Sequence, residues 1–272
     1  MTFEVVDDVA LALDAGRLAA SSVTLTVTGR LGPLVEFHFL RRAAEARYRG
    51  IQIEANEISR LLDAAFAGRT TGTTRGAVAG FLPLAKRQPE TDDPLWIRWS
   101  LTAQHAARRA GVAPKLAQSL IGALNELEDN VHMHSGAPAT GIAGFAVTEE
   151  AFEVVVADAG IGILESLRQA PDVAGLTDGG EALRLALSDG ISRFGRGQGR
   201  GYGFATMFTA LAGHEAALRF RSGDHALTIV GTGPTLAHAV ISQKAALPGF
   251  IVSILCPARG GSGPARPFNR PS

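Results

Sequence analysis

The chain has little of what marks a secreted or membrane protein. It contains a single cysteine, Cys256, among 272 residues, which excludes an internal disulfide framework and indicates a reducing compartment. No apolar run approaches the roughly 18 residues of a membrane-spanning helix. Acidic residues, Glu4, Asp7 and Asp8, stand where a secretory signal carries Lys or Arg. We therefore expect a cytoplasmic protein that does not enter a membrane.

The chain also lacks an excess of charge of either sign. Lys plus Arg and Asp plus Glu number 26 each, so there is no global attraction toward nucleic acid or an acidic membrane surface. Hydrophobic residues make up 46% of the chain and charged residues 19%. A sizeable core is therefore available, wholesale disorder is not expected, and no nucleic-acid partner is indicated.

The first ninety residues predict a small α/β unit, although no motif in them reveals a role. Residues 22–28 and 51–54 alternate between apolar and polar side chains, as half-buried strands do. Between them, residues 34–49 carry apolar side chains on one helical face. Asn56 can cap a further helix. This order of elements predicts an α/β domain over residues 1–90, in which the first ten to twenty residues are a short apolar lead.

A second and larger domain is predicted over residues 95–257. Residues 68–80 and 86–94 are rich in Gly, Thr or Pro and have no periodicity, so we expect loops there and a domain boundary near residue 90. Further helices are expected at residues 96–110, 114–135 and 203–211, and strands at residues 142–147, 153–157, 218–221, 227–230 and 250–255. The last residues, 258–272, are mostly Gly, Pro, Arg and Ser and predict a disordered tail.

The helix that begins at Pro114 carries two stripes of side chains. The apolar stripe consists of Leu116, Leu120, Leu124, Leu127 and Val131 and must face a core. The polar stripe consists of Glu126, Asn130 and His134, which recur every four residues and so lie on one face. Asn130 offers a hard oxygen ligand for Mg²⁺, and Glu126 can accept a proton from a water or hydroxyl aligned with a γ-phosphate. Taken alone, the polar stripe is better explained as an ordinary solvated face.

A carboxylate and two glycines follow the predicted strand at residues 153–157. Asp158 comes directly after the apolar residues of that strand, at the strand end where α/β sheets place ligands. A carboxylate accepts hydrogen bonds from an exocyclic amine such as that of adenine. Gly160 and Gly162 lack side chains, so a flat ring can approach the backbone. A tight turn without any ligand explains the same residues equally well.

A third segment alternates glycine with other residues. It contains Gly199, Arg200, Gly201, Tyr202 and Gly203 and leads into the predicted helix. Its backbone N–H groups can surround phosphate oxygens at a helix N-terminus, where the dipole also favours anions. The alternatives are a flexible linker, which the apolar residues that follow argue against, and an Arg-Gly tract for RNA, for which the segment is too short.

Other nucleotide and metal motifs are excluded. The sequence contains no Gly-x-x-x-x-Gly-Lys-Ser/Thr segment, and no Gly-x-Gly-x-x-Gly segment follows a predicted strand. His132 and His134 are two residues apart on a helix, so their side chains point about 200° from each other and one metal ion cannot easily take both.

The three segments, in this order, resemble those of the GHKL ATPases, the family of gyrase, the heat-shock chaperone, histidine kinases and MutL. The resemblance covers roughly residues 95–257, with residues 125–135 similar to the family's N box. Residues 158–162 and 199–204 are similar to its first and second glycine boxes. The resemblance implies a two-layer α/β sandwich with a mixed sheet, preceded here by the small N-terminal α/β unit.

The resemblance also implies a role for each segment in binding ATP and Mg²⁺. Glu126 would be the general base or water-orienting residue and Asn130 the Mg²⁺ ligand. Asp158 would contact the adenine amine. The remaining residues that would touch the nucleotide are Gly160 and Gly162 beneath the base, and Gly199, Arg200, Gly201, Tyr202 and Gly203 along the phosphates. Residues 164–198 would form a mobile lid over ATP.

The chain departs from sensor histidine kinases because it contains no His-Glu-x-x-x-Pro segment for a phospho-acceptor helix. It is more similar to stand-alone bacterial ATP-binding proteins, some of which are anti-sigma-factor serine kinases that pair with a small α/β antagonist. Three functions are therefore open: a serine/threonine protein kinase of the anti-sigma type, an ATP-gated interaction module with slow hydrolysis, and a scaffold that holds ADP. The partner would be a small α/β antagonist, a sigma-like factor or a second copy of the chain.

Overall fold

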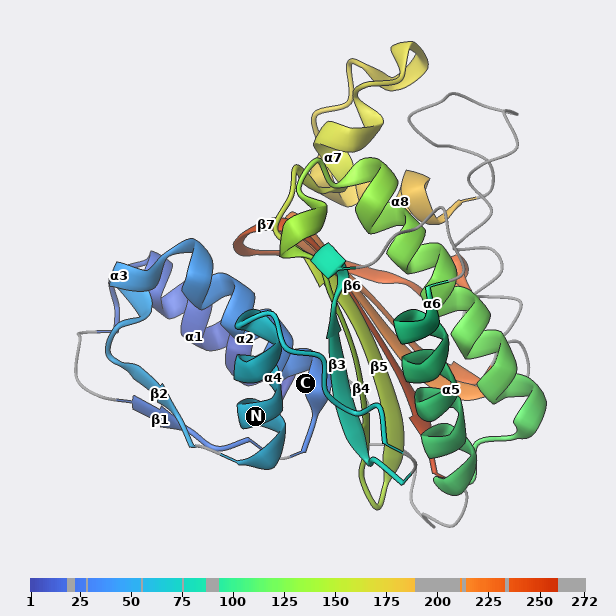
Figure 1. Ribbon diagram of the computed structural model, residues 1–272. Coiled ribbons are helices and arrows are strands. Elements are labelled where there is room, and N and C mark those ends of the chain that lie inside the picture. Colours follow the sequence, from blue (N-terminus) through green and yellow to red (C-terminus); the bar gives the residue numbers. More distant parts are fainter. Residues whose placement is uncertain are drawn as a thin grey trace.

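A β-sheet with helices on both of its faces forms the centre of the fold (Figure 1). The computed structural model describes residues 1–18, 23–27, 29–54, 56–74, 76–86, 93–188, 211, 214–232 and 235–258. Within them, the sheet has five strands, which in spatial order are β3 (Ala79–Pro83), β4 (Ile142–Val147), β5 (Ala151–Asp158), β7 (Val240–Pro257) and β6 (Glu215–Thr232). The predicted α/β class and sandwich architecture are thus confirmed.

The register of the sheet places the end of β5 against the middle of β7. Asp158 is paired with Phe250, and every described strand pair in this sheet is antiparallel. The mixed sheet expected from the family resemblance is therefore not found among these strands. The parallel pairing in the described chain belongs to a small separate sheet, β1 (Val23–Leu25) with β2 (Ile51–Ile53).

Two long helices cover one face of the sheet. These are α5 (Pro94–Arg109) and α6 (Pro114–His134), and each begins with a proline, which fits the first helical turn because it lacks the N–H that would be unpaired there. All five residues of the apolar stripe predicted on α6 are buried. They pack with residues of α5 and with inward side chains such as Val154 and Val156 of β5. The predicted helix and its buried face are confirmed.

The other face of the sheet is covered by N-terminal helices. The elements there are α1 (Phe3–Asp14), α2 (Leu31–Ala43), α3 (Glu45–Tyr48) and α4 (Glu57–Phe66). Their apolar residues pack with Val155 and Ala157 of β5, which alternate with the residues that face α6. Asn56 caps α4 by accepting a hydrogen bond from the Ser59 N–H at 2.9 Å, as predicted.

Smaller elements follow the end of β5. Helix α7 (Gly162–Leu167) begins directly after the turn that follows Asp158, and α8 (Gly179–Leu187) comes next. Short 3₁₀ turns lie at Leu84–Lys86, Pro138–Thr140, Pro171–Val173 and Leu236–His238. In the described part of the chain, no helix is both long and apolar enough to cross a bilayer.

Several predicted elements differ from the structure. The segment expected to be a short apolar lead is helix α1, and the loop expected at residues 68–80 runs into strand β3. The strands expected at residues 218–221 and 227–230 are parts of one long strand, β6. The predicted helix at residues 203–211 and the predicted tail at 258–272 lie outside the described residues apart from residues 211 and 258.

The domain boundary near residue 90 stays a prediction, because it concerns whether the two parts of the chain fold independently. Strand β3 precedes this boundary, yet it pairs with β4 of the second predicted domain. Helix α2 also packs against β5 and β7. The N-terminal elements therefore share an extensive interface with the main sheet.

Candidate nucleotide site

Asp158 has the least usual environment of the predicted site residues. It is the last residue of β5, and only 1% of its surface is exposed. Its Oδ1 atom accepts a hydrogen bond from the Gly160 N–H at 2.7 Å. Its Oδ2 atom is buried and has no hydrogen-bond partner among the described residues. Burial raises the pKa of Asp158 to about 7, and the Gly160 N–H only partly opposes this shift.

The turn after Asp158 packs against the C-terminal end of α6. The Ile161 N–H donates to the Ser135 carbonyl oxygen at 2.8 Å. A Cβ atom on Gly160 would collide with that same carbonyl group, so a glycine is needed there for packing between the turn and the helix. This contact accounts for Gly160 without a ligand, and it joins two of the three predicted segments.

A serine from β6 supports the other side of the turn. Ser222 Oγ accepts from the Ile163 N–H at 2.9 Å and donates to the Gly249 carbonyl at 2.8 Å. Gly162 has a φ of +77°, and a Cβ on it would lie 2.8 Å from Ser222 Oγ. A side chain at this position would therefore be strained both by its backbone conformation and by contact with Ser222. Together with Gly160, this glycine is explained by the packing of the turn.

A threonine closes the turn from a third direction. Thr140 Oγ1 accepts from the Ala159 N–H at 2.9 Å and donates to the Ala137 carbonyl at 2.7 Å. The turn is thus held by hydrogen bonds from three separate parts of the chain, around residues 135, 140 and 222. Sequence reasoning missed Thr140 and Ser222, because neither belongs to one of the three glycine or acidic segments.

The polar stripe of α6 leads along the helix toward this turn. Glu126 is exposed, and Asn130 and His134 are half-buried. Ser135, which touches the turn, follows Glu126 by nine residues, or about 13 Å along a helix axis. Glu126 and Asn130 are therefore on the helix that abuts Asp158, with Asn130 one turn closer to it. The family resemblance assigns roles to both, and those roles stay predictions.

A second carboxylate on α6 was missed by sequence reasoning. Glu128 is fully buried, and its Oε1 atom lies 2.8 Å from Nε2 of His132, one helical turn later. The spacing of four residues between an acid and a histidine is a signal that the sequence contains. His132 thus faces a carboxylate on its own helix, and the rejection of a shared His132–His134 metal site stays a prediction.

The predicted phosphate segment is outside the part of the chain that the structure describes. Gly199, Arg200, Gly201, Tyr202 and Gly203 all lie outside the described residues. Of the predicted lid, residues 164–188 are described and contain most of α7 and all of α8. The third segment of the proposed site is therefore a prediction from sequence alone.

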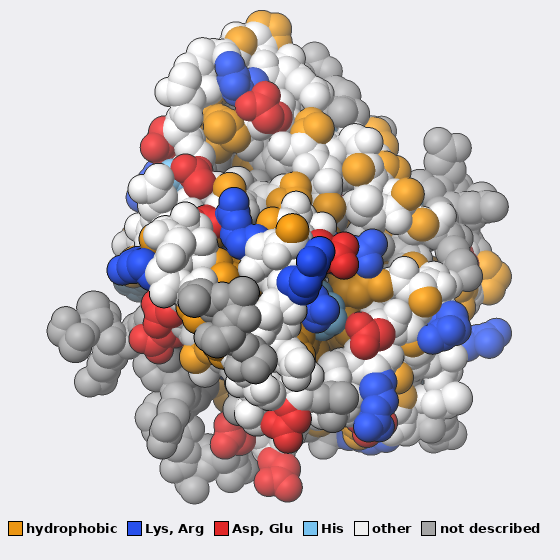
Figure 2. Space-filling model, turned by 90° about the vertical axis from the view of Figure 1, so that its left-hand side faces the viewer, with side chains coloured by type: hydrophobic (Ala, Val, Ile, Leu, Met, Phe, Trp, Pro, Cys, Tyr) orange, Lys and Arg blue, Asp and Glu red, His pale blue; other side chains and the backbone are white. Residues whose placement is uncertain are grey.

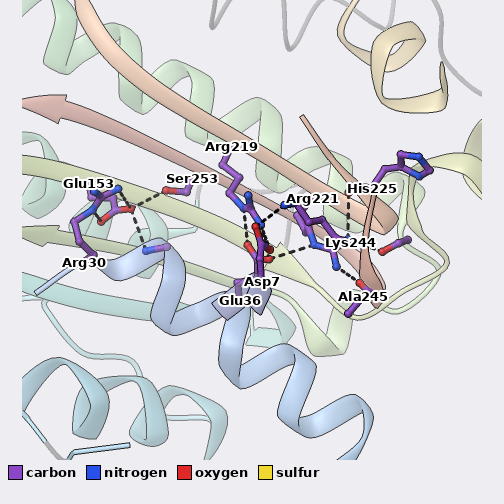
Figure 3. A network of polar contacts seen from close by, with 12 residues as sticks. Asp7, Arg30, Glu36, Glu153, Arg219, Arg221, His225, Lys244, Ala245 and Ser253 are labelled. Carbon is purple, nitrogen blue, oxygen red and sulfur yellow. Dashed lines mark hydrogen bonds and ion pairs between the residues drawn. The ribbon is translucent and has the colours of Figure 1, made fainter. Parts of the chain in front are cut away.

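A buried charge cluster lies on the opposite face of the sheet (Figure 3). Arg219 of β6 donates to Glu36 of α2 at 2.8 and 2.9 Å and to Asp7 of α1 at 2.6 Å. Arg221 of β6 donates to Glu36 at 3.2 Å. Burial would raise the pKa of Glu36, but the guanidinium groups of Arg219 and Arg221 hold it below its usual value. The alternation of Arg219 and Arg221 with apolar residues is typical of a strand with one solvated face, so it does not reveal that both arginines are buried.

The N-terminal end of α2 is held by a carboxylate from β5. Glu153 accepts from the backbone N–H groups of Leu31 and Gly32 at 2.7 and 3.1 Å and from Ser253 Oγ at 2.8 Å. Arg30 also pairs with Glu153 at 3.2 Å (Figure 3). A negative charge at a helix N-terminus is favoured by the helix dipole. The N-terminal helices are thus attached to the sheet through charges at two places.

Figure 2 shows one face of the molecule, on which acidic and basic side chains are interspersed without a field of one sign. In the described residues, no group of three or more His, Cys, Asp and Glu side chains could hold a metal ion.

No protein-family model, no curated protein and no solved structure matches this chain.

Proposed function

We propose that this chain binds ATP with Mg²⁺ in the manner of the GHKL ATPases, which its three segments resemble. The observation that carries the proposal is the buried Oδ2 atom of Asp158 without a hydrogen-bond donor. A buried acceptor left unpaired costs about 1–3 kcal/mol, so such atoms are rare in folded proteins and call for an explanation. The exocyclic amine of adenine is a donor of the right kind for this atom.

The residues on α6 fit the metal that ATP carries. Mg²⁺ takes one or two protein ligands and otherwise binds water and phosphate oxygens, so it does not need a cluster of acidic side chains. Asn130 is half-buried, and its amide oxygen would be such a ligand. When bound, the ion would neutralise charge on the phosphates. The exposed carboxylate of Glu126 would accept the proton of the attacking water or hydroxyl.

Among the activities open to such a site, we favour a regulatory serine/threonine protein kinase of the anti-sigma type. Glu126 would then take the proton from a hydroxyl of a partner, either a small α/β antagonist or a sigma-like factor. A second candidate is an ATP-gated interaction module with slow hydrolysis. It is favoured by the N-terminal helices, which are attached to the far face of the sheet by the buried charges of Asp7 and Glu36.

The base-reading step can be tested by comparing two nucleotides. Inosine triphosphate has a carbonyl in place of the exocyclic amine of ATP, and its N1 carries a hydrogen, so the donor at position 6 that Asp158 would accept from is replaced by an acceptor. Titration calorimetry with Mg²⁺ should show that the wild-type protein prefers ATP over inosine triphosphate by about tenfold or more. The Asp158→Asn variant should bind ATP more weakly and lose this preference.

The control is Asp8→Asn, which makes the same chemical change on an exposed residue of α1. It should leave both affinities unchanged. An Asp158→Asn protein that is folded and keeps full affinity for ATP would refute the proposed base contact. If the wild-type protein binds neither nucleotide, the proposed function itself is wrong.

The two candidate activities are separated by a partner assay. A kinase should transfer radiolabelled γ-phosphate from ATP to a protein captured from the same cells. An interaction module should capture or release that protein on exchange of ATP for ADP without labelling it.

A further inference from the structure

Two consecutive residues of β6 connect the N-terminal helices with the turn around Asp158. Arg221 is in the buried charge cluster beneath α2, and Ser222 is hydrogen-bonded to the turn. Successive side chains of a strand point to opposite faces of the sheet, so these contacts are on opposite sides of one short piece of backbone. The N-terminal unit and the candidate nucleotide site thus meet through adjacent residues.

Ser222 supports the turn at more than one point. Its hydroxyl joins the Ile163 N–H, just after the glycine turn, to the Gly249 carbonyl of β7, and it is buried. Gly249 in turn lies directly against Asp158, because a Cβ on Gly249 would collide with the Asp158 carbonyl. A shift of Ser222 would therefore disturb the backbone on both sides of the Asp158 carboxylate.

Arg221 fixes the backbone from which Ser222 projects. Besides Glu36, its guanidinium donates to the carbonyl oxygens of Gly223 at 2.6 Å, His225 at 3.2 Å and Ala245. These carbonyls surround the place where the β6–β7 register shifts, between Ser222 and His225. Glu36 is the carboxylate that pairs with Arg221, and it is fully buried.

We propose that helix α2 holds the turn around Asp158 in shape through Glu36, Arg221 and Ser222, so that docking of the N-terminal helices sets the affinity for nucleotide. Ser222 is a positioning residue here, because its contacts are with the backbone of the turn. The part concerning affinity rests on the proposed function, whereas the part concerning the shape of the turn does not. Because linkage is reciprocal, nucleotide binding would also strengthen the docking of α2.

The first test compares two carboxylates of the same buried cluster. Glu36→Gln removes the charge that pairs with Arg221, whereas Asp7→Asn removes a partner of Arg219 and Lys244 and leaves Arg221 paired. The measurement is amide hydrogen exchange at Ile163, followed by NMR in the full chain without nucleotide. We expect exchange at Ile163 to increase about tenfold in Glu36→Gln and to stay within about threefold of wild type in Asp7→Asn.

The second test uses a pair of buried serines and does not depend on Glu36→Gln folding. Ser222→Ala removes the hydroxyl that supports the turn. Ser253→Ala removes an equally buried hydroxyl of β7, whose partner is Glu153 at 2.8 Å. Both variants should lose a similar amount of thermal stability. Only Ser222→Ala should expose Ile163 to exchange and weaken ATP binding, by about fivefold for one hydrogen bond.

Arg221→Lys keeps the positive charge beside Glu36 but cannot reach the Gly223, His225 and Ala245 carbonyls together. Arg221→Lys should therefore increase amide hydrogen exchange at Ile163, as Ser222→Ala does.

The outcomes separate this inference from the proposed function. If the wild-type protein binds no ATP but Glu36→Gln and Ser222→Ala still expose Ile163 more than their controls do, the positioning of the turn is supported and the nucleotide function is refuted. If ATP binds and the variants match their controls in both exchange and affinity, the inference is overturned and the nucleotide function stands. A rise in exchange that is the same in Asp7→Asn and Glu36→Gln would also overturn it, because general loosening of the N-terminal helices would then suffice.

Discussion

The Ser135 carbonyl at the end of α6 accepts a hydrogen bond from the Ile161 N–H at 2.8 Å. This one bond joins the helix that carries Glu126 and Asn130 to the turn that follows Asp158. The two segments are 23 residues apart, counted from Ser135 to Asp158, and they are separated in the chain by the hairpin of β4 and β5. Because of this contact, we propose one ligand for both segments.

Replacing Gly160 with alanine tests how tight this contact is. A Cβ at residue 160 would collide with the Ser135 carbonyl and lie 2.9 Å from Asp158 Oδ1. Backbone has to move to accommodate it, so we expect Gly160→Ala to lower stability by about 1–3 kcal/mol and to weaken nucleotide binding. Chemical denaturation and titration calorimetry measure the two effects.

Gly122 provides the matched control for this substitution. It lies in the interior of α6, and a Cβ on it would have no atom within 4 Å. Alanine is a better helix former than glycine, so Gly122→Ala should raise stability by about 0.5–1 kcal/mol. If Gly160→Ala is as stable as Gly122→Ala, the close packing of the turn on α6 is wrong.

Local patterns in the sequence were sufficient to predict α6 and the position of Asp158. The leucine stripe has the period of a helix with one buried face, and its members are buried. Asp158 follows a run of valines that is typical of a central strand, and β5 is buried along its whole length. Where one pattern repeats over several turns or residues, local physics determines the element.

The attachment of the N-terminal helices could not be predicted in the same way. It depends on Glu36 meeting Arg219 and Arg221, residues more than 180 positions apart in the sequence. Nothing local indicates which of the 26 acidic residues in the chain will be buried beside these arginines. Strand β3 was also missed, since it is short, contains a glycine and a proline, and gains its hydrogen bonds from β4.

The pH dependence of stability should report the environment of Asp158. The pKa is about 7 in the folded protein against an ordinary value of 3.8, because the carboxyl is buried. At pH values between these two pKa values, the Asp158 carboxyl is protonated in the folded state and ionised in the unfolded state. The stability that depends on this protonated carboxyl is therefore fully present below about pH 4 and is lost as pH rises through about 7.

The effect of this one group can be isolated with Asp158→Asn, which cannot titrate. As pH rises from about 5.5 to 8, the melting temperature of the wild-type protein, measured without nucleotide, should fall relative to that of Asp158→Asn. For a pKa shift of this size, the corresponding change in the free energy of unfolding of wild type relative to the variant is as much as a few kcal/mol. A difference that stays constant over this range would show that Asp158 is ionised at the lower pH as well.

Binding of adenosine should have the opposite pH dependence. In the proposed contact the base would donate its amine to the ionised carboxylate, so affinity should rise as pH is raised through about 7. Adenosine is preferred to ATP for this titration because its own charge does not change there. Asp158→Asn should remove the pH dependence, and a wild-type affinity that does not vary with pH would contradict the assigned contact.

The apolar stripe of α6 gives a prediction about stability alone. Leu124 is fully buried between α5 and the sheet, so Leu124→Ala should cost about 2–5 kcal/mol. Leu101 of α5 is 49% exposed, and Leu101→Ala should cost less than about 0.5 kcal/mol. Denaturant unfolding of both variants makes the comparison. Equal losses would mean that α6 does not pack on the sheet as described.

Asn130→Ala tests the proposed metal ligand. In wild type, Mg²⁺ should strengthen ATP binding, and this gain should be lost in Asn130→Ala while binding in the presence of EDTA is unchanged. The control is Asn125→Ala, which removes an amide on the same helix whose oxygen accepts from Trp96 Nε1 at 2.8 Å. Its Mg²⁺ dependence should match that of wild type. An unaltered metal dependence in Asn130→Ala would assign the ion to other ligands.

Glu126→Gln separates binding of ATP from its turnover. Glutamine has nearly the shape of glutamate but cannot accept a proton, so ATP affinity should stay within about twofold while hydrolysis or phosphotransfer falls about 100-fold or more. Glu149→Gln is the control, because this exposed residue lies beyond the opposite end of β5 from Asp158, and its turnover should equal that of wild type. Single-turnover assays with labelled ATP measure both rates. Full activity in Glu126→Gln would show that this residue has no part in the chemistry. A wild-type protein that binds ATP without any turnover would favour the nucleotide-holding scaffold over both the kinase and the hydrolysing module.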